Sequence, residues 1–565
     1  MPVAPLARVS AFAPTIEVAP RRHTGRAWPG AGLLLSLGLL ACAAQGQSSP
    51  GAQPLGAASP AFTPLTGSVA APGSAVSTWP APLQQALKQS GLPADAVSLL
   101  VWPVDSPQPR WQHLADTPRQ AASVMKLFTT GAALRQLGPA HVWRTEVGLG
   151  GALRTQGTLN GPLYLRGGGD PSLLIEHVQR MMARWRDAGL RDIRGGIVID
   201  RGLFELPAHD PSAFDGQPLR PYNAGPDALL LNHQSVTLRL MPDAARPGQA
   251  LAFIEPPLRG VQIEHRLPLA PGVACGDWRG ALKLDIVPQP GLQPDGRNRW
   301  SVRLTGPYPA ACGEKEWPLL WTGDGPGDHA ARLLEAAWQG SGGQLGAPVR
   351  DGAWPSGLPV WQTWVSPPLA SVVRDINKFS NNVMARQLFL SLALAPNGSN
   401  GAVETGGMSA VNGVNGVHGI NGPATLAQAR AVVGRQVVEA TGGAASACRE
   451  DALALDNGSG LSRQEHASAR CLAQWLQAMW RSPVMPEFIA SLPLNGVDGT
   501  TRRWQAAAGL AHIKTGSLDG VSSVAGYVLG ESGQRVVVVG LVNHPRADAA
   551  RPLLQALVDW ARQER

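Results

Sequence analysis

The spacing of apolar and polar residues predicts both strands and helices along this chain. At 97–104, V-S-L-L-V-W-P-V is apolar enough for a buried strand. At 123–138, S-V-M-K-L-F-T-T-G-A-A-L-R-Q-L-G repeats apolar residues at helical spacing and ends on a glycine, the residue favoured just past a helix. Toward the C-terminus, D-G-V-S-S-V-A-G-Y-V-L-G, R-V-V-V-V-G-L-V-N and P-L-L-Q-A-L-V-D-W-A predict two strands and a final helix.

The pattern changes between about residues 146 and 324. Short apolar runs such as G-G-I-V-I-D, S-V-T-L-R-L and W-S-V-R-L are separated by Gly and Pro, which predicts a mostly β region of two subdomains. Helical spacing returns with D-H-A-A-R-L-L-E-A-A-W. We therefore expect one domain, made of residues 80–145 and 325–565, to be interrupted by an insertion at 146–324. The length of 565 residues suits about three domains.

The N-terminal residues predict export. Three arginines precede A-G-L-L-L-S-L-G-L-L-A-C-A-A-Q-G, an apolar run long enough for a signal peptide and short for a membrane span, so we assign 1–46 to a signal peptide. Cys42 follows Leu-Leu-Ala and half resembles a lipidation site, so a lipid anchor at Cys42 and simple cleavage after Ala44 or Gly46 are both open. Residues 47–78 are rich in Pro, Ser, Ala and Gly without charges, which predicts a flexible linker.

The cysteine count agrees with export. Without Cys42, four cysteines remain, an even number suited to an oxidising compartment. Pairing Cys275 with Cys312 would place one disulfide in the insertion, and pairing Cys448 with Cys471 would place one in the interrupted domain. The sequence alone leaves this pairing open.

Charge and ligand spacing exclude several classes of function. The formal net charge is +8, of which the first 46 residues contribute +3, and so mild an excess on the mature chain does not indicate nucleic-acid binding. There is no C-x-x-C pair, and the histidines lack the spacing of metal ligands. We expect neither a metal site nor a cofactor.

Three short motifs carry the candidate chemistry: A-S-V-M-K at 122–126, S-N-N at 380–382 and K-T-G-S at 514–517. Lysine is rare here, since only six of the 48 basic residues are lysines, yet Lys126 and Lys514 both fall in these motifs. An ammonium group can lose its proton when it is desolvated, whereas a guanidinium stays charged, so a proton-transferring site must keep lysine.

The spacing of the first motif suits a serine nucleophile. Ser123 and Lys126 lie three positions apart, which on a helix places both side chains on one face, within reach of proton transfer. Ser123 would lie in the first turn, where the helix dipole favours an alkoxide and a neutral amine.

Each motif also has a structural alternative. Ser123 could cap a helix, Ser380 could cap the helix that follows it, and Lys514 could face solvent at a strand edge. The three motifs in this order leave those alternatives little room, because S-x-x-K, S-D-N and K-T-G form one mechanistic set for serine acyl transfer.

With these motifs, the chain resembles the D-alanyl-D-alanine carboxypeptidases/endopeptidases of the low-molecular-mass class C penicillin-binding proteins, peptidase family S13. The segments G-G-G-D-P-S-L at 167–173, G-S-G-L-S-R at 458–463 and G-V-D-G-T at 496–500 also resemble that family. Lys126 and Ser380 are 254 positions apart, from 126 to 380, which indicates a large insertion. One departure is Asn381, where many related enzymes have aspartate.

The resemblance implies a fold and a set of roles. The fold would be a β-lactamase/transpeptidase-like α/β (α+β) domain, with an antiparallel sheet flanked by helices. Ser123 would attack the peptide carbonyl with Lys126 as base, and Ser380 with Lys514 would deliver a proton to the leaving amine. Substrate would be bound by the remaining motif residues, Asn382, Thr515, Gly516 and Ser517, with oxyanion donors from the backbone N–H groups of Ser123 and Ser517.

The resemblance also implies partners and a compartment. Peptidoglycan stem peptides would be the substrate and β-lactam antibiotics the inhibitors, with the enzyme in the periplasm. A lipid at Cys42 would add peripheral membrane association. The oligomeric state, and the balance of carboxypeptidase and endopeptidase activity, are open.

Two rival functions have to be weighed against this one. A serine β-lactamase would share the acylation chemistry, but the long insertion argues against it. Glu450 also lacks the asparagine of the E-x-x-L-N pattern that supplies a deacylating base. A non-catalytic peptidoglycan-binding envelope protein would not need Ser123, Lys126, Ser380 and Lys514 together.

Overall fold

The computed structural model describes residues 78–293, 295–394 and 422–563. The predicted signal peptide, Cys42 and almost all of the predicted linker lie outside these ranges. Within them, no helix is long and apolar enough to cross a membrane.

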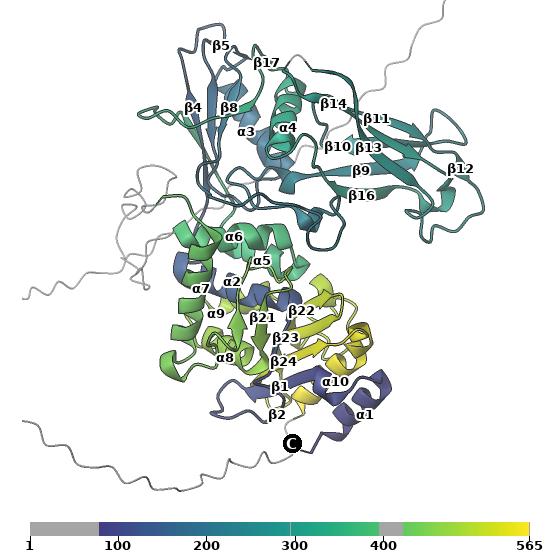
Figure 1. Ribbon diagram of the computed structural model, residues 1–565, viewed down its shortest axis with the longest axis vertical. Helices are drawn as coiled ribbons and strands as arrows, with labels where there is room; N and C mark the ends of the chain where they lie inside the picture. Colours follow the sequence, from purple (N-terminus) through teal and green to yellow (C-terminus); the bar gives the residue numbers. More distant parts are fainter. Residues whose placement is uncertain (1–77, 294, 395–421, 564–565) are drawn as a thin grey trace, which may run out of the picture. The chain divides into compact units, whose positions relative to one another are not determined.

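The interrupted domain carries the three motifs and is named the catalytic domain for them. It is built on one antiparallel sheet of five strands in the order β2-β1-β24-β23-β22 (Figure 1). Its strands are β1 (Val97–Pro103), β2 (Trp111–His113), β22 (Ala511–Leu518), β23 (Val521–Leu529) and β24 (Arg535–Asn543). The apolar runs near 97 and after 514 therefore form strands, as predicted. β22, which carries the K-T-G-S motif, is an edge strand.

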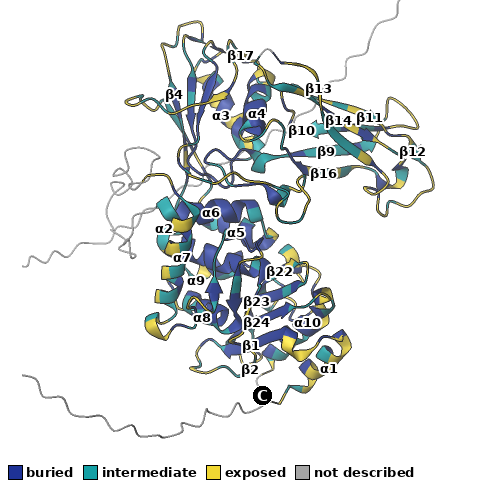
Figure 2. Cartoon of the chain, in the orientation of Figure 1, coloured by how far each residue is buried: buried dark blue, intermediate teal, exposed yellow. Residues whose placement is uncertain are grey.

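Both faces of this sheet are buried, because successive side chains of a strand point to opposite sides. In β24, Val537, Val539 and Leu541 enter one apolar core, and Val536 and Val538 enter the other. Figure 2 shows the central strands β1, β23 and β24 as mostly buried. A sheet covered on both faces requires nearly continuous apolar strands, and the run R-V-V-V-V-G-L-V-N meets that requirement.

Helices cover the two faces unequally. One core contains residues of the terminal helices α1 (Ala81–Ser90) and α10 (Arg551–Arg562). The other core contains residues of a larger helical group. Its members are α2 (Lys126–Leu137), α5 (Leu369–Phe379), α6 (Asn382–Leu394), α7 (Leu426–Ala440), α8 (Ala469–Trp480) and α9 (Met485–Ser491).

The first part of the insertion combines strands with two helices. A five-stranded sheet has the order β18-β8-β6-β4-β19, and a smaller one has the order β17-β7-β5. The elements are β4 (Arg144–Leu149), β5 (Thr158–Leu159), β6 (Leu163–Arg166), α3 (Ile175–Asp187), β7 (Asp192–Ile193), β8 (Ile197–Asp200), α4 (Asp328–Gly340), β17 (Gln344–Leu345), β18 (Arg350–Asp351) and β19 (Gln362–Val365). β6 and β8 run parallel, and α3 makes the crossover that parallel neighbours need.

The second part of the insertion consists of strands and short turns. Its sheets have the orders β10-β9-β16, β11-β14-β13 and β12-β15. The strands are β9 (Ser235–Pro242), β10 (Ala250–Glu255), β11 (Val261–Arg266), β12 (Leu269–Ala270), β13 (Lys283–Leu292), β14 (Asn298–Thr305), β15 (Tyr308–Pro309) and β16 (Lys315–Leu320). The predicted strand-rich insertion is therefore present.

The predicted end of the insertion at residue 324 is too early. α4, which we assigned to the resumed catalytic domain, buries Leu333 and Trp338 in the core of the insertion. The strands after it pair with insertion strands, β17 with β7, β18 with β8 and β19 with β4. The helices of the catalytic domain resume only at α5. The first boundary, at 145/146, falls inside β4.

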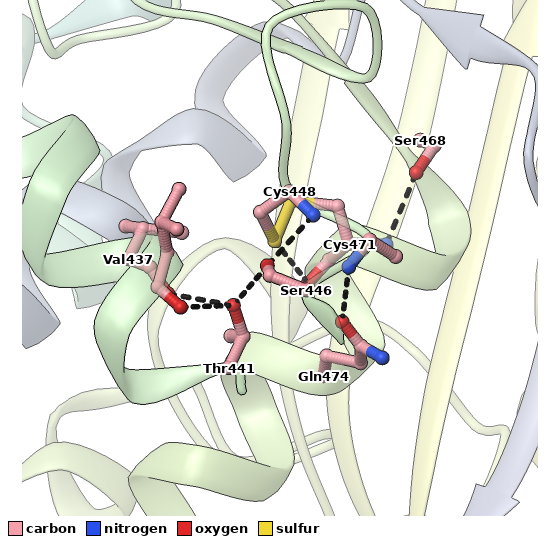
Figure 3. The surroundings of a disulfide bond; sticks show 9 residues. Val437, Thr441, Ser446, Cys448, Ser468, Cys471 and Gln474 are labelled. Carbon is pink, nitrogen blue, oxygen red and sulfur yellow. Dashed lines mark hydrogen bonds between the residues drawn. A yellow bond between two sulfur atoms is a disulfide. The ribbon is translucent and has the colours of Figure 1, made fainter. Parts of the chain in front are cut away.

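Both disulfides that we considered are formed, Cys275–Cys312 in the insertion and Cys448–Cys471 in the catalytic domain. The second links the segment after α7 to α8 (Figure 3). The N–H of Cys448 donates to the Ser446 hydroxyl at 2.9 Å, and the N–H of Cys471 donates to the N-cap hydroxyl of Ser468 at 3.1 Å. This disulfide therefore lies in a segment that is also held by hydrogen bonds.

Packing between α2 and α8 predicts that an alanine substitution at Gly131 will destabilise the fold. A methyl group added at Gly131 on α2 would lie 2.7 Å from a ring carbon of the buried Trp475. We expect Gly131→Ala to lower the free energy of unfolding by about 1–3 kcal/mol, because overpacking outweighs the gain in helix propensity. Urea denaturation followed by tryptophan fluorescence measures this.

The matched control is Gly434 on α7, where an added methyl group would meet nothing within 4 Å. Gly434→Ala should leave stability unchanged or raise it by up to about 1 kcal/mol. Equal effects of the two substitutions would contradict the packing argument.

Candidate active site

The candidate nucleophile lies in a short 3-10 turn, Ala122–Met125, that continues directly into α2. This agrees with the predicted helix, which ends before Gly138. Ala122 has φ 46°, in the left-handed region that non-glycine residues rarely adopt. The turn therefore holds Ser123 in a constrained backbone immediately before the helix.

Lys126 is fully buried and its amine contacts three oxygen atoms. Nζ lies 2.9 Å from Ser123 Oγ and 2.5 Å from Asn382 Oδ1, and it also donates to the backbone carbonyl of Ser459. At 2.9 Å, the Ser123 hydroxyl can donate to the nitrogen whenever that amine is neutral. Two residues predicted to form the site, Ser123 and Lys126, thus meet as expected, and Asn382 joins them.

The electrostatic surroundings favour the neutral form of this amine. Burial lowers the pKa of Lys126 well below its ordinary value, and the positive charges of Lys514 and Arg386 lower it further. The carboxylate of Glu465 acts in the opposite direction. Desolvation is the largest of these effects, because an ammonium in a low-dielectric site loses its hydration.

A second serine and lysine pair faces the first. Lys514 is fully buried, and its Nζ donates to Ser380 Oγ at 2.9 Å and to the carbonyl of Thr515 at 2.8 Å. Burial lowers the pKa of Lys514 to about 7. Its structural alternative, a solvent-facing lysine at a strand edge, is therefore wrong.

The turn between α5 and α6 explains the S-N-N motif. Ser380 ends α5 in the left-handed conformation, with φ 57°. The side chain that caps α6 is Asn381, whose Oδ1 accepts from the N–H of Met384 at 3.0 Å. Asparagine and aspartate both cap helices well, so Asn381 can replace the aspartate of many relatives. Ser380 is thereby free to bind Lys514 rather than cap the helix.

The strand β22 forms one wall of the site, next to the turn that carries Ser123. At Gly516, an added methyl group would lie 2.7 Å from the carbonyl of Ala121 and 2.8 Å from the nitrogen of Ser123. Glycine is therefore required for the strand to approach the nucleophile turn this closely. Beside it, the Thr515 hydroxyl hydrogen-bonds to the Thr500 hydroxyl at 2.8 Å, and Ser517 is exposed.

A pocket of about 780 Å³ adjoins this wall. Thr515, Gly516 and Ser517 line it together with Lys378 and Phe379, which precede Ser380, and with residues of η7 (Gly499–Thr501) and the segment after it. Basic side chains outnumber acidic ones along the described lining, which includes Arg502, Arg503 and Arg551. The pocket is therefore suited to an anionic group beside β22.

Several contributing residues were missed by the sequence analysis. Ser459 and Thr500 lie in segments that we quoted only for their resemblance, and Glu465 and Arg386 lie in no motif. Asp498, in the same segment as Thr500, pairs with Lys378 Nζ at 2.6 Å. The described residues contain no group of three or more His, Cys, Asp or Glu side chains placed to hold a metal ion.

Comparison with known proteins agrees with this geometry. The sequence profile of the D-Ala-D-Ala carboxypeptidase 3 (S13) family matches residues 80–424 and 414–564. The chain belongs to this family. It is therefore an enzyme of the serine-type D-Ala-D-Ala carboxypeptidase class, as the motifs predicted.

Individual relatives of this S13 chain are distant in sequence. A D-alanyl-D-alanine carboxypeptidase of Actinomadura sp. (strain R39) is 28% identical over 457 residues, 76% of this chain and 74% of that protein. The D-alanyl-D-alanine carboxypeptidase DacB of Haemophilus influenzae is 23% identical over 434 residues, 75% of this chain and 80% of that protein.

A solved structure confirms the fold. The crystal structure of penicillin binding protein 4 (dacB) from H. influenzae superposes with a TM-score of 0.62 at 18% sequence identity. The match covers 85% of this chain and 98% of that one. The predicted α/β (α+β) fold, with an antiparallel sheet flanked by helices and a large insertion, is thus confirmed.

The buried amine of Lys514 predicts a pH-dependent stability. Between pH 7 and 10.5 the unfolded chain keeps the lysine proton that the folded chain has lost, so wild-type stability rises with pH in this window. Lys514→Met should be more stable than the wild type near pH 7. Its advantage should shrink by up to about 1.4 kcal/mol per pH unit toward pH 10.5.

Urea denaturation of both proteins across this pH range measures the difference. Lys88→Met is the control, because Lys88 is exposed on α1. A stability difference between Lys514→Met and the wild type that does not change with pH would show that Lys514 is charged when folded.

Proposed function

We propose that this S13 enzyme hydrolyses D-Ala-D-Ala bonds, and also D-alanyl cross-links, in peptidoglycan stem peptides through an acyl-enzyme on Ser123. The contact between the buried Lys126 amine and Ser123 Oγ, at 2.9 Å, is the observation that carries this proposal. A serine hydroxyl is a weak nucleophile until a neighbouring base removes its proton, and a neutral lysine in contact with it is such a base.

Acylation begins when the Ser123 hydroxyl proton moves to the lone pair of Lys126 Nζ. Ser123 Oγ then bonds to the carbonyl carbon of the penultimate D-alanine. The carbonyl oxygen becomes an oxyanion, which the backbone N–H groups of Ser123 and Ser517 stabilise. Such a donor typically contributes a few kcal/mol. The close approach allowed by Gly516 supports this pairing of donors from two segments.

The second pair serves the leaving group. Ser380 Oγ passes its proton to the departing nitrogen as the C–N bond breaks, and it regains a proton from Lys514 Nζ, 2.9 Å away. A pKa of about 7 for Lys514 suits this role, because proton transfer is most efficient when the group titrates near the working pH. Water then hydrolyses the acyl-enzyme and restores Ser123.

Substrate recognition follows from the wall and the pocket. The substrate backbone would lie along the 514–517 end of the edge strand β22, because residues 493–495 already bind the backbone of Ala511 and Ile513. Asn382 accepts from Lys126 through Oδ1, so its Nδ2 can donate to a substrate carbonyl. The Thr515 and Ser517 hydroxyls would bind the terminal carboxylate.

The arginine-lined pocket would accommodate the leaving side of the substrate. It borders Lys378 and Phe379, immediately before Ser380, and Thr515, immediately after Lys514. This is the pair that protonates the leaving amine, so what departs must lie on this side. Both a terminal D-alanine and the longer amine of a cross-link carry carboxylates, which arginines bind well. The volume of about 780 Å³ has room for either group.

The compartment and the inhibitors belong to the same proposal. The segment assigned to a signal peptide supports export to the periplasm, where peptidoglycan is found, and lipidation of Cys42 would hold the enzyme at a membrane. The mass of the mature N-terminus, measured on protein from its native host, decides between cleavage and a lipid anchor. The crystal structure of H. influenzae penicillin binding protein 4 in complex with a β-lactam supports sensitivity to this inhibitor class.

Labelled penicillin tests the proposed nucleophile and base. We expect one stable label per chain at Ser123 in the wild type, and no label in Ser123→Ala or in Lys126→Arg, because a guanidinium cannot accept the proton. Mass spectrometry of the labelled peptide and its time course provide the measurement. Lys88→Arg is the matched control, since Lys88 is exposed on α1, and it should label normally.

The same experiment separates the rival functions. Loss of the label within seconds would indicate a β-lactamase. A wild-type protein that binds peptidoglycan but takes up no label would indicate a non-catalytic envelope protein, and full labelling of Lys126→Arg would refute the assigned base.

The pocket arginines predict an effect on substrate affinity. Arg502→Gln combined with Arg503→Gln should raise KM about tenfold or more for stem peptides that end in a free carboxylate, because a charge-assisted contact is lost. The change should be absent for substrates whose terminal carboxylate is amidated. Peptide hydrolysis, followed by release of D-alanine or of D-alanine amide, measures both.

Arg154→Gln, an exposed arginine in the insertion, is the control for the loss of positive charge. If the double variant raised KM equally for free and amidated substrates, the arginines would not bind the terminal carboxylate.

A further inference from the structure

Glu465 is a fully buried carboxylate that the proposed mechanism does not use. It is 1% exposed and directly precedes the short strand β21 (His466–Ser468). Isolated ionised carboxylates are almost never buried, because removing them from water is costly unless hydrogen bonds replace the hydration. The burial of Glu465 therefore requires hydrogen-bond donors around its carboxylate.

Four backbone N–H groups surround this carboxylate. Oε1 accepts from the N–H groups of Asp456, Asn457 and Gly458 at 3.0, 3.1 and 2.9 Å. Oε2 accepts from the N–H of Gly460 at 2.6 Å. Successive backbone amides that converge on one point form an anion-binding nest, here occupied by a side chain of the same chain. The loop 456–460 is therefore wrapped around Glu465.

This loop contacts the catalytic lysine and the nucleophile turn. The carbonyl of Ser459, in the middle of the loop, accepts from Lys126 Nζ. The Thr129 hydroxyl, one turn further along α2, donates to the carbonyl of Gly458 at 2.6 Å. At Gly460, with φ 78°, an added methyl group would lie 1.9 Å from the carbonyl of Ala122. The loop is therefore packed directly against the elements that carry Ser123 and Lys126.

We propose that Glu465 is a positioning residue of this active site. By binding the amides of residues 456–460, its carboxylate fixes the Ser459 carbonyl that holds the amine of Lys126 against Ser123, and its negative charge acts on the same amine. The proposal rests on the proposed function, in which Lys126 is the base.

The charges around the two groups define the expected electrostatic effect. Lys126 is faced by Lys514 from β22 and by Arg386 from α6, which both lower its pKa, and by Glu465, which raises it. Burial raises the pKa of Glu465, while its amide donors oppose that shift and the carboxylate of Asp456 adds to it. Glu465 therefore opposes the effects of Lys514 and Arg386 on the pKa of Lys126.

Glu465 does not take part in the chemistry directly. Both of its oxygens are bound by amides of the loop, and it is the Ser459 carbonyl of that loop that contacts the lysine. It therefore acts on Lys126 rather than on the substrate or on water. A positioning residue of this kind changes both the rate and the pH at which the base becomes active.

The test is Glu465→Gln, with the second-order rate of acylation by penicillin measured from pH 5 to 10. In glutamine one oxygen becomes an N–H donor, which cannot accept from Gly460, and the charge is lost. We expect acylation to slow by up to about 100-fold, because the base is misplaced. We also expect the acidic limb of the pH profile to move to lower pH, since the ammonium form of Lys126 loses a stabilising charge.

Glu450→Gln is the matched control, because it removes the same charge at an exposed position. It should change neither the rate nor the profile. A folded Glu465→Gln protein whose acylation rate or acidic limb matches the wild type would overturn the proposal. Normal wild-type acylation at Ser123 in the same experiment separates this failure from a failure of the proposed function.

A measurement on the wild type covers the case in which Glu465→Gln does not fold. Amide hydrogen exchange should show the amides of residues 458 and 460 strongly protected, although they lie in no helix or strand. Protection should decrease at acidic pH as the carboxyl group gains a proton. Rapid exchange of these amides at neutral pH would contradict the proposed nest.

Discussion

Two lysine amines buried beside two serine hydroxyls are the constraint to which the rest of the site is adapted. Burying an ammonium ion is costly unless an acid pairs with it, so a lysine in this position is favoured in its neutral form. The partners of Lys126 and Lys514 are hydroxyl, amide and carbonyl oxygens. Burial that would only destabilise an ordinary core therefore lowers the pKa of both amines, as their proposed roles of base and acid require.

The fold supplies this burial by bringing four separate segments together. The nucleophile turn, the turn between α5 and α6, the edge strand β22 and the loop 456–460 each contribute a group. Gly516 and Gly460 allow two of these segments to approach the nucleophile turn more closely than any side chain would permit. The sheet beneath them is buried on both faces, which keeps the segments from shifting. Rigid packing and close backbone approach thus both keep the two lysine amines buried beside the serines.

Much of the fold was predictable because strands and helices leave local patterns. The apolar runs that form β1, β23 and β24, the helix after Ser123 and the final helix were all expected. The extent of the insertion was not, because the apolar face of α4 suits either domain. Only the pairing of β17, β18 and β19 with strands of the insertion assigns that segment, and strand pairing at long range leaves no local signal.

The sequence by itself determined the chemistry of this protein, because reactive side chains have to be of particular types. Ser123, Lys126, Ser380 and Lys514 could be chosen from motif spacing and from the scarcity of lysine. The tertiary structure alone decided how those groups are held. Ser459 contributes a backbone carbonyl and Glu465 binds backbone amides. Nearly every residue carries these backbone groups. Which of them reach the site therefore depends on the path of the chain in space and not on the residue types in the sequence.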